Sequence, residues 1–277
     1  MSTAHAQRSL DAGDGAITVE KDGGVLLIGI DRPAKRNALT PGLLARLGEV
    51  YSYYESSDAL RCAVLFGHGK AFCAGADLNE IKDTVDIADA GSDRMDPFQL
   101  AGPTLSKPLV VAAHGACVGA GLELALAGDI IVAELATKLG QPEAQRGIFA
   151  FGGGSVRWPL RVGWGNAQRY LLTGDLLDAR EAWRIGLVQE VVSRGAARDR
   201  AAVLATVIAS SAPLGVRSTL AVGRRAVYEG PTAAFEEQAR CRSEIMRSAD
   251  AAEGIASFVE RRPARYTGYE WLLLGGC

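Results

Sequence analysis

Apolar runs in the first half of the chain predict short strands separated by turns and helices. Residues 16–33, "AITVEKDGGVLLIGIDRP", contain two such runs around an Asp-Gly pair, which predicts a β-hairpin that ends at Pro33. Residues 40–57 instead place apolar side chains at helical spacing, and Thr40 followed by Pro41 predicts a helix start. Further buried strands are predicted for "CAVLFGHG", "KPLVVAAHGAC" and "DIIVAEL", and a helix for "GAGLELALAG".

After about residue 155 the pattern becomes mainly helical, with Gly or Pro between the helix-like segments. Strand–turn–helix alternation followed by helices predicts an α/β core with a helical C-terminal region. We expect a tail over residues 1–15, an α/β catalytic core over 16–200, a helical region over 201–268 that packs against another subunit, and a second tail over 269–277.

The composition narrows the class of protein. The 277 residues are 48% hydrophobic and 22% charged, which allows a large buried core. The formal net charge of −2 gives no general attraction to nucleic acid or to an anionic membrane. Five scattered cysteines without a C-x-x-C pair predict reduced thiols in a cytoplasmic protein. No signal peptide, membrane span or histidine spacing typical of a metal site is predicted.

Two turns rich in Gly and Ala are the most informative local features. Residues 69–81, "GKAFCAGADLNEI", and residues 114–125, "HGACVGAGLELA", both set small side chains at a turn next to a helix. Backbone N–H groups at such turns can face a ligand, and small side chains let a bulky acyl group approach them. Side by side, they would form an oxyanion hole for a carbonyl that gains negative charge. The glycine pattern by itself favours the alternative of two ordinary tight turns.

Two glutamates favour the catalytic interpretation. Glu123 lies in the first turn of the apolar helix, and Glu143 follows 20 residues later, after the strand "DIIVAEL". That interval is long enough for a helix, a loop and a strand to return the chain to the same end of the layer. A buried carboxylate is costly unless it is paired or used. The alternatives are a partner of the helix dipole for Glu123 and an ordinary loop carboxylate for Glu143.

Five blocks, in this order and spacing, resemble the crotonase superfamily, and most closely its enoyl-CoA hydratase/isomerase proteins. The resemblance runs from about Ala16 to about Gly268. It implies a crotonase/ClpP-like α/β fold, in which a spiral of ββα units forms two roughly perpendicular sheets, and C-terminal helices that build a trimer or a hexamer. The blocks are "DRPAKRNALT", "GKAFCAGADLNEI", "HGACVGAGLELALAGDI", "LGQPEAQRGIFAFGGG" and "LLTGDLLDAREAWRIGLVQEVV".

The resemblance also implies an acyl thioester of coenzyme A as the substrate, with no further cofactor and no metal. Ala76 and Ala120 match the positions whose N–H groups bind the thioester carbonyl. Glu123 and Glu143 match the two hydratase acids, which add water to Cβ and a proton to Cα of a 2-enoyl-CoA. We assign Glu123 as the base that activates water and Glu143 as the proton donor to Cα.

The first two blocks are expected to bind the CoA part of the substrate. In relatives the segment that contains Ala38 passes the adenine, and Lys35 and Arg36 are candidates for phosphate contacts. The alternative for both cations is an ordinary solvated surface charge. Asp77 is expected to support its loop through backbone hydrogen bonds. The remaining residues expected here are Ala74, Gly75, Ala76 and Leu78.

Two departures from the family pattern leave the reaction open. Ala120 stands where many relatives have glycine, and Ala150-Phe151 where many hydratases have Pro-Gly. Phe149, Phe151 and Trp164 are expected either near the acyl pocket or in the core. We expect syn hydration of a 2-enoyl-CoA to a 3-hydroxyacyl-CoA in lipid metabolism. The alternatives are isomerisation, hydrolysis or decarboxylation of a CoA thioester, and acyl-CoA binding without catalysis.

Overall fold

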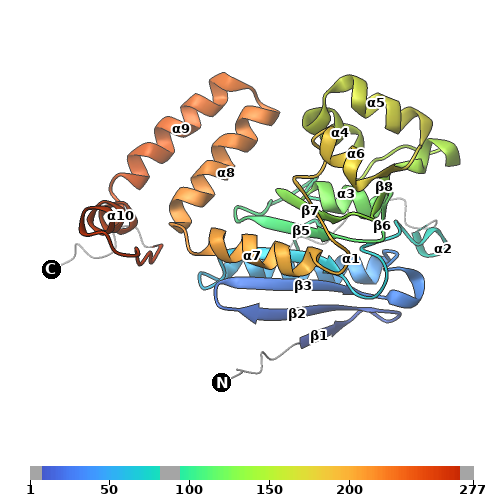
Figure 1. The fold of residues 1–277 in the computed structure, drawn as a ribbon, viewed down its shortest axis with the longest axis horizontal. Helices are drawn as coiled ribbons and strands as arrows, with labels where there is room; N and C mark the ends of the chain where they lie inside the picture. Colours follow the sequence, from blue (N-terminus) through green and yellow to red (C-terminus); the bar gives the residue numbers. More distant parts are fainter. Residues whose placement is uncertain (1–7, 82–93, 269–277) are drawn as a thin grey trace.

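The computed structural model describes residues 8–81 and 94–268 (Figure 1). A seven-stranded sheet contains, in spatial order, β1 (Arg8–Asp11), β2 (Ala16–Asp22), β3 (Val25–Asp31), β4 (Cys62–Gly67), β5 (Leu109–Ala113), β7 (Ile130–Glu134) and β10 (Glu190–Val192). The pairs β1–β2 and β2–β3 are antiparallel, and all later pairs are parallel. A three-stranded sheet contains β6 (Ala116–Val118), β8 (Lys138–Gly140) and β9 (Leu177–Asp178).

Helices cover both faces of the larger sheet and form the whole C-terminal part. The described α-helices are α1 (Pro41–Ser56), α2 (Leu78–Ile81), α3 (Ala120–Leu126), α4 (Gly154–Val162), α5 (Trp164–Thr173), α6 (Ala179–Arg184), α7 (Ala197–Ala209), α8 (Pro213–Tyr228), α9 (Pro231–Ile245) and α10 (Ala249–Glu260). Two short 3-10 helices, η1 (Pro33–Lys35) and η2 (Pro142–Arg146), follow β3 and β8. This is the α/β architecture with two sheets and C-terminal helices that the resemblance implies.

The N-terminal strands agree with the sequence pattern except at the very edge of the sheet. The predicted hairpin forms from β2 and β3. The expected tail over residues 1–15 is wrong for Arg8–Asp11, which pairs with β2 as β1. The sequence "RSLD" contains a single apolar residue, so it carries no strand signal, and main-chain bonds to β2 hold it in the sheet. Residues 1–7 and the expected tail over 269–277 lie outside the described residues.

Alternate residues of a strand point to opposite faces of the large sheet. One of these faces packs against α7. Cys62, Val64 and Phe66 of β4 lie on this face with alanines of α7. The buried residues of α7 are Ala197, Ala201, Ala205 and Ala209. Their four-residue spacing places small side chains along one stripe of the helix, which lets its backbone lie close to the strands.

The other face holds the main core and α1. Thr40 is the N-cap of this helix, because its hydroxyl accepts a hydrogen bond from the Leu43 N–H at 3.1 Å. Leu43, Leu47 and Tyr51 then point into the core at helical spacing. The predicted helix and its start at Thr40 and Pro41 are therefore confirmed.

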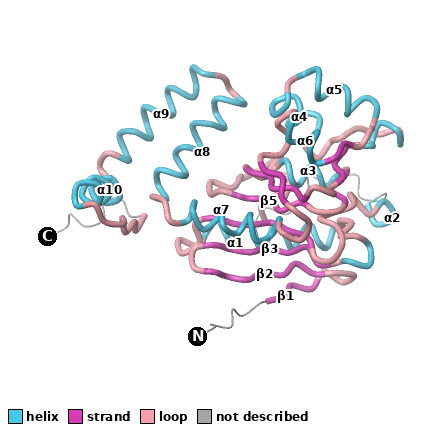
Figure 2. The backbone as a smooth tube through the Cα atoms, in the orientation of Figure 1, coloured by secondary structure: helices cyan, strands magenta, loops and turns pink. Residues whose placement is uncertain are grey.

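The C-terminal helices extend away from this core. Figure 2 shows α8, α9 and α10 as a purely helical arm beside the block of strands. No residue of α8 is buried, and apolar side chains such as Phe235 and Phe258 are exposed on α9 and α10. Over residues 8–81 and 94–268 no single helix is long and apolar enough to span a bilayer; α7 and α8 pass that test only together, across a bend of 108°.

Candidate active site

The two small-residue turns lie against each other. Cys73 donates its N–H to Ala116 O at 3.0 Å, and Val118 donates its N–H to Cys73 O at 3.2 Å. Gly75 has φ of +104°, and a Cβ there would lie 3.3 Å from Val118 O and 3.9 Å from the Ala120 nitrogen. A glycine is therefore needed where one turn passes the other.

Two backbone N–H groups at this junction remain available for a ligand. Within the described residues, neither Ala76 nor Ala120 donates its N–H to a protein acceptor. Ala120 is the first residue of α3, after Gly119 with φ of +56° as the N-cap, so its N–H is one of the donors that a helix leaves unpaired. Two N–H groups that lack a protein acceptor are the kind of donors that an oxyanion hole needs.

The first sequence block holds the turn that contains Ala76. Leu39 donates its N–H to Gly75 O and accepts the Asp77 N–H, both at 2.8 Å. The buried Arg32 guanidinium donates to the Asp77 carboxylate at 2.8 Å. This hydrogen bond holds the pKa of Asp77 below its ordinary value. Asp77 also accepts the Asn79 N–H at 3.3 Å, so its carboxylate fixes the loop, as the sequence predicts.

Glu123 is a buried carboxylate near these donors. Its side chain is 4% exposed, and its Oε1 accepts the Gly154 N–H at 2.9 Å. Burial raises the pKa of Glu123 to about 7; the hydrogen bond from Gly154 opposes this rise, and the charge of Glu143 adds to it. Added Cβ atoms at Gly152 and Gly154 would lie 2.6 and 3.0 Å from its oxygens. The backbone of Gly152 and Gly154 therefore packs directly against the carboxylate, where a side chain would not fit.

The raised pKa gives a stability prediction for Glu123→Gln. The pKa of this carboxyl is about 7 in the folded chain against an ordinary 4.5, so the folded state holds the proton more tightly. The free energy of unfolding of the wild type should therefore fall between about pH 4.5 and 7, by about 3 kcal/mol in total. Glutamine has no such titration. Urea unfolding measures the difference in free energy of unfolding between the variant and the wild type. This difference should shift in favour of the variant by roughly 2 to 3 kcal/mol as the pH rises from 4.5 to 8.

The matched control for this experiment is Glu80→Gln, which makes the same isosteric change at an exposed position of α2. The change leaves Glu123 in place, so the variant should keep the fall in stability that the wild type shows between about pH 4.5 and 7. A constant difference between Glu123→Gln and the wild type over this pH range would contradict the shifted pKa.

Glu143 enters the same space from η2. It is 9% exposed, and its Oε1 would lie 3.1 Å from a Cβ added at Gly119. Burial raises its pKa, and the nearby positive charge of Arg146 opposes the rise. The buried Gln141 amide, in the orientation that satisfies its neighbours, donates to Glu143 Oε1 at 3.0 Å and to Gly119 O at 3.1 Å. One amide therefore ties the second acid to the N-cap of α3.

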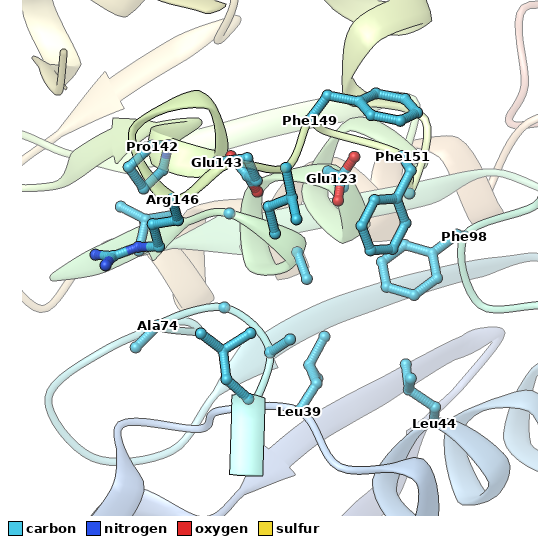
Figure 3. Close-up of a pocket in the computed structure, with 18 of the residues that line it drawn as sticks. Leu39, Leu44, Ala74, Phe98, Glu123, Pro142, Glu143, Arg146, Phe149 and Phe151 are labelled. Atoms are coloured by element: carbon cyan, nitrogen blue, oxygen red, sulfur yellow. The ribbon is translucent and has the colours of Figure 1, made fainter. Parts of the chain in front are cut away.

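A cavity of about 480 Å³ connects these groups. Figure 3 shows Glu123 and Glu143 in its middle, Arg146 and Ala74 toward one end, and Phe98 toward the other. Its remaining wall is mostly apolar. Two carboxylates with raised pKa values in an apolar cavity beside unpaired N–H groups can move protons on a substrate whose carbonyl oxygen is held.

The comparisons with known proteins identify the family of this chain. The model of the enoyl-CoA hydratase/isomerase family matches residues 20–269. A crystal structure of a "probable enoyl-CoA hydratase/isomerase" from Mycobacterium abscessus superimposes with a TM-score of 0.89 at 43% identity, over 94% of this chain and 100% of that one. The chain belongs to the enoyl-CoA hydratase/isomerase family.

Relatives within this family differ in the reaction that their names state. Enoyl-CoA hydratase EchA19 of Mycobacterium tuberculosis is 32% identical, over 93% of this chain and 98% of its own. Carnitinyl-CoA dehydratase of Proteus mirabilis is 35% identical, over 89% of this chain and 96% of its own. Membership in the enoyl-CoA hydratase/isomerase family therefore implies a CoA-thioester enzyme without specifying its reaction.

Most residues that the family resemblance selects line the cavity. They are Ala74, Gly75, Ala76, Leu78, Ala120, Glu123 and Glu143. Lys35, Arg36, Ala38 and Asp77 are not part of its wall. Lys35 and Arg36 are exposed, and Arg36 O accepts the Ala74 N–H at 3.0 Å, so both cations lie next to the Ala74 end.

Phe149, Phe151 and Trp164, expected near the acyl pocket or in the core, are all exposed and do not belong to the core. Phe149 and Phe151 are 65% and 49% exposed and line the cavity. Trp164 is 73% exposed and is not part of the cavity wall. Within the two described ranges, no group of three or more His, Cys, Asp or Glu residues has an arrangement that could hold a metal ion.

Several residues that shape the site were not selected from the sequence. Asn37, fully buried, accepts the Arg32 N–H and donates to His68 O and Ala71 O. Gln141 and Arg157 likewise donate hydrogen bonds to residues far away in the sequence, Gly119 and Phe98. The available signal was a polar residue beside a recognised motif, such as Gln141 two residues before Glu143.

Proposed function

We propose that this chain is a 2-enoyl-CoA hydratase, which adds water across the Cα=Cβ double bond to give a 3-hydroxyacyl-CoA. The observation that carries the proposal is the placement of two buried carboxylates, Glu123 and Glu143, in one apolar cavity beside the unpaired N–H groups of Ala76 and Ala120. A double-bond shift needs one residue that moves a proton. Hydration needs an acceptor for a water proton and a donor for Cα, and both carboxylates are present.

In the proposed reaction the thioester oxygen accepts hydrogen bonds from Ala76 and Ala120. Glu123 takes a proton from water while the water oxygen forms a bond to Cβ. The electrons of the double bond move toward the thioester, where the two N–H groups stabilise the enolate. Glu143 then gives its proton to Cα, and the two carboxylates recover their starting states by proton exchange with solvent.

The acidities fit these roles. A general base works best when its pKa lies near the working pH, and burial raises the pKa of Glu123 to about 7. The donor must carry a proton near neutral pH, and burial also raises the pKa of Glu143. The two groups interact electrostatically, so they titrate as a pair.

The Ala74 end of the cavity is the proposed CoA side. The adjacent Lys35 and Arg36 would pair with its phosphates, and Ala38 would lie along the adenine. The arm formed by α8 to α10 is proposed to assemble the chain into a homotrimer or a hexamer, because its exposed apolar residues include Phe235, Ile255 and Phe258. Sedimentation at several concentrations tests this assembly.

The reaction is tested with the purified full chain and a series of 2-enoyl-CoA substrates. We expect loss of the conjugated thioester absorbance and formation of the 3-hydroxyacyl product by mass spectrometry. No hydration at any chain length would overturn the proposal. The Glu123→Gln variant separates the main alternative: if it still isomerises a 3-enoyl-CoA as fast as the wild type while neither hydrates, the chain is an isomerase.

A further inference from the structure

The apolar end of the cavity points to a class of acyl group. We infer that this chain selects thioesters with an extended apolar acyl chain over short ones, through a subsite formed by Leu44, Phe98, Leu100, Phe149 and Phe151. We call these five residues the aromatic end. The inference rests on the CoA-thioester binding mode of the proposed function and goes beyond it by assigning the acyl tail.

The contacts around the cavity indicate which end holds the CoA part of the substrate and which end holds its acyl chain. The carbonyl oxygen lies at the N–H groups of Ala76 and Ala120, and Cβ lies between the two carboxylates. The CoA part leaves past Ala74, which is bonded to the strongly basic segment at Arg36. The acyl chain beyond Cβ therefore runs the other way, toward Phe98 and Phe151 (Figure 3).

The aromatic end carries apolar surface that the described residues of the chain leave exposed. Phe149 and Phe151 are 65% and 49% exposed, and Leu100 is 50% exposed, although all three line the cavity. The two phenyl rings meet edge to face, with centroids 5.9 Å apart and planes at 74°. Rings that hold each other in this geometry present a fixed apolar surface to a ligand. A long acyl chain would bury this surface, whereas a short acyl group would leave it exposed to solvent.

One buried guanidinium joins two of the segments that form this subsite. Arg157 on α4 is 9% exposed and donates to Phe98 O at 2.7 Å, to Gln99 O at 3.2 Å and to Gly152 O at 3.5 Å. These acceptors lie in two segments, the one that contains Phe98 and the one that follows Phe151. Leu100 also packs against the second segment, because its Cδ2 lies 3.0 Å from a Cβ added at Gly153. The Arg157 guanidinium therefore joins the two segments before a ligand binds, which lowers the cost of ordering the subsite.

The test measures binding of saturated acyl-CoA esters, which have no double bond to hydrate. Isothermal titration of the full chain should show an increase in affinity of about threefold for each added methylene, as expected for partial burial of a CH₂ group. Octanoyl-CoA should then bind roughly 50- to 100-fold more tightly than butanoyl-CoA. Equal affinities for the two esters would overturn the inference.

Two variants locate the effect. Phe151→Ala should weaken octanoyl-CoA binding by about tenfold, and Leu100→Ala by about threefold, while butanoyl-CoA binding changes by less than about twofold. Leu172→Ala is the matched control for Leu100→Ala, because Leu172 is 72% exposed on α5 and does not line the cavity. An equal loss for both esters in Phe151→Ala would place the acyl chain elsewhere.

The same experiment separates this inference from the proposed reaction. Chain-length-dependent binding without hydration of any 2-enoyl-CoA would support the acyl subsite and overturn the hydratase proposal. Hydration with binding that does not depend on chain length would support the reaction and overturn the subsite.

Discussion

Replacing Ala120 with proline should lower kcat for hydration by about 100- to 1,000-fold, the usual cost of losing one oxyanion donor. Proline removes the Ala120 N–H and places its ring where the thioester oxygen binds. The fold should tolerate the change, because Ala120 is the first residue of α3 and its N–H has no acceptor within the described part of the chain. The preceding Gly119 has no Cβ to clash with the ring.

The matched variant is Ala120→Gly, which keeps the N–H and removes only a methyl group. Its kcat should stay within about threefold of the wild type. Steady-state kinetics on the same 2-enoyl-CoA compare the proline and glycine variants. Circular dichroism and thermal unfolding verify that both are folded. A folded proline variant that hydrates at the wild-type rate would exclude the Ala120 N–H from the reaction.

The Glu143→Gln variant should lower kcat by about 100- to 10,000-fold, because an amide has no proton to give to Cα. The shape of the side chain is kept, and the loop stays in place through Gln141 and the backbone. The affinity for a saturated acyl-CoA should therefore change by less than about threefold, which makes the loss one of kcat and not of binding.

Glu80→Gln makes the same isosteric change at an exposed position of α2 and should hydrate normally. Product formation is followed by mass spectrometry in all three proteins. If Glu143→Gln keeps more than a tenth of the wild-type kcat, Glu143 is not the proton donor, and Glu123 alone would have to serve both steps.

Local signals in the sequence were sufficient for most of the core. The hairpin of β2 and β3, the start of α1 at Thr40, and the position of Glu123 in the first turn of α3 each depend on residues within one short segment. Burial of Glu123 is a different matter, because it depends on Gly152 and Gly154, about 30 residues away, which supply backbone instead of side chains around the carboxylate.

The contacts that shape the cavity could not be predicted because they join segments far apart in sequence. Arg157 looks like one of two arginines in an amphipathic helix, and its three acceptors lie in two separate loops. Gln141 looks like a loop residue until its amide is found between Glu143 and Gly119. The edge strand β1 was missed for another reason: its pairing uses main-chain groups, which every sequence has.

The loop after Glu143 divides into two parts with opposite tolerance to change. At positions 149 and 151 the side chains reach open space, so a larger or smaller residue alters what fits there without displacing a neighbour. A methyl group at 152 would collide with the Glu123 carboxylate, and one at 154 with Gln141 and Ala150. Variation in the first part can therefore change the preferred acyl group while the chemistry stays intact, so a library randomised only at 149 and 151 should yield altered chain-length ranges with few inactive members.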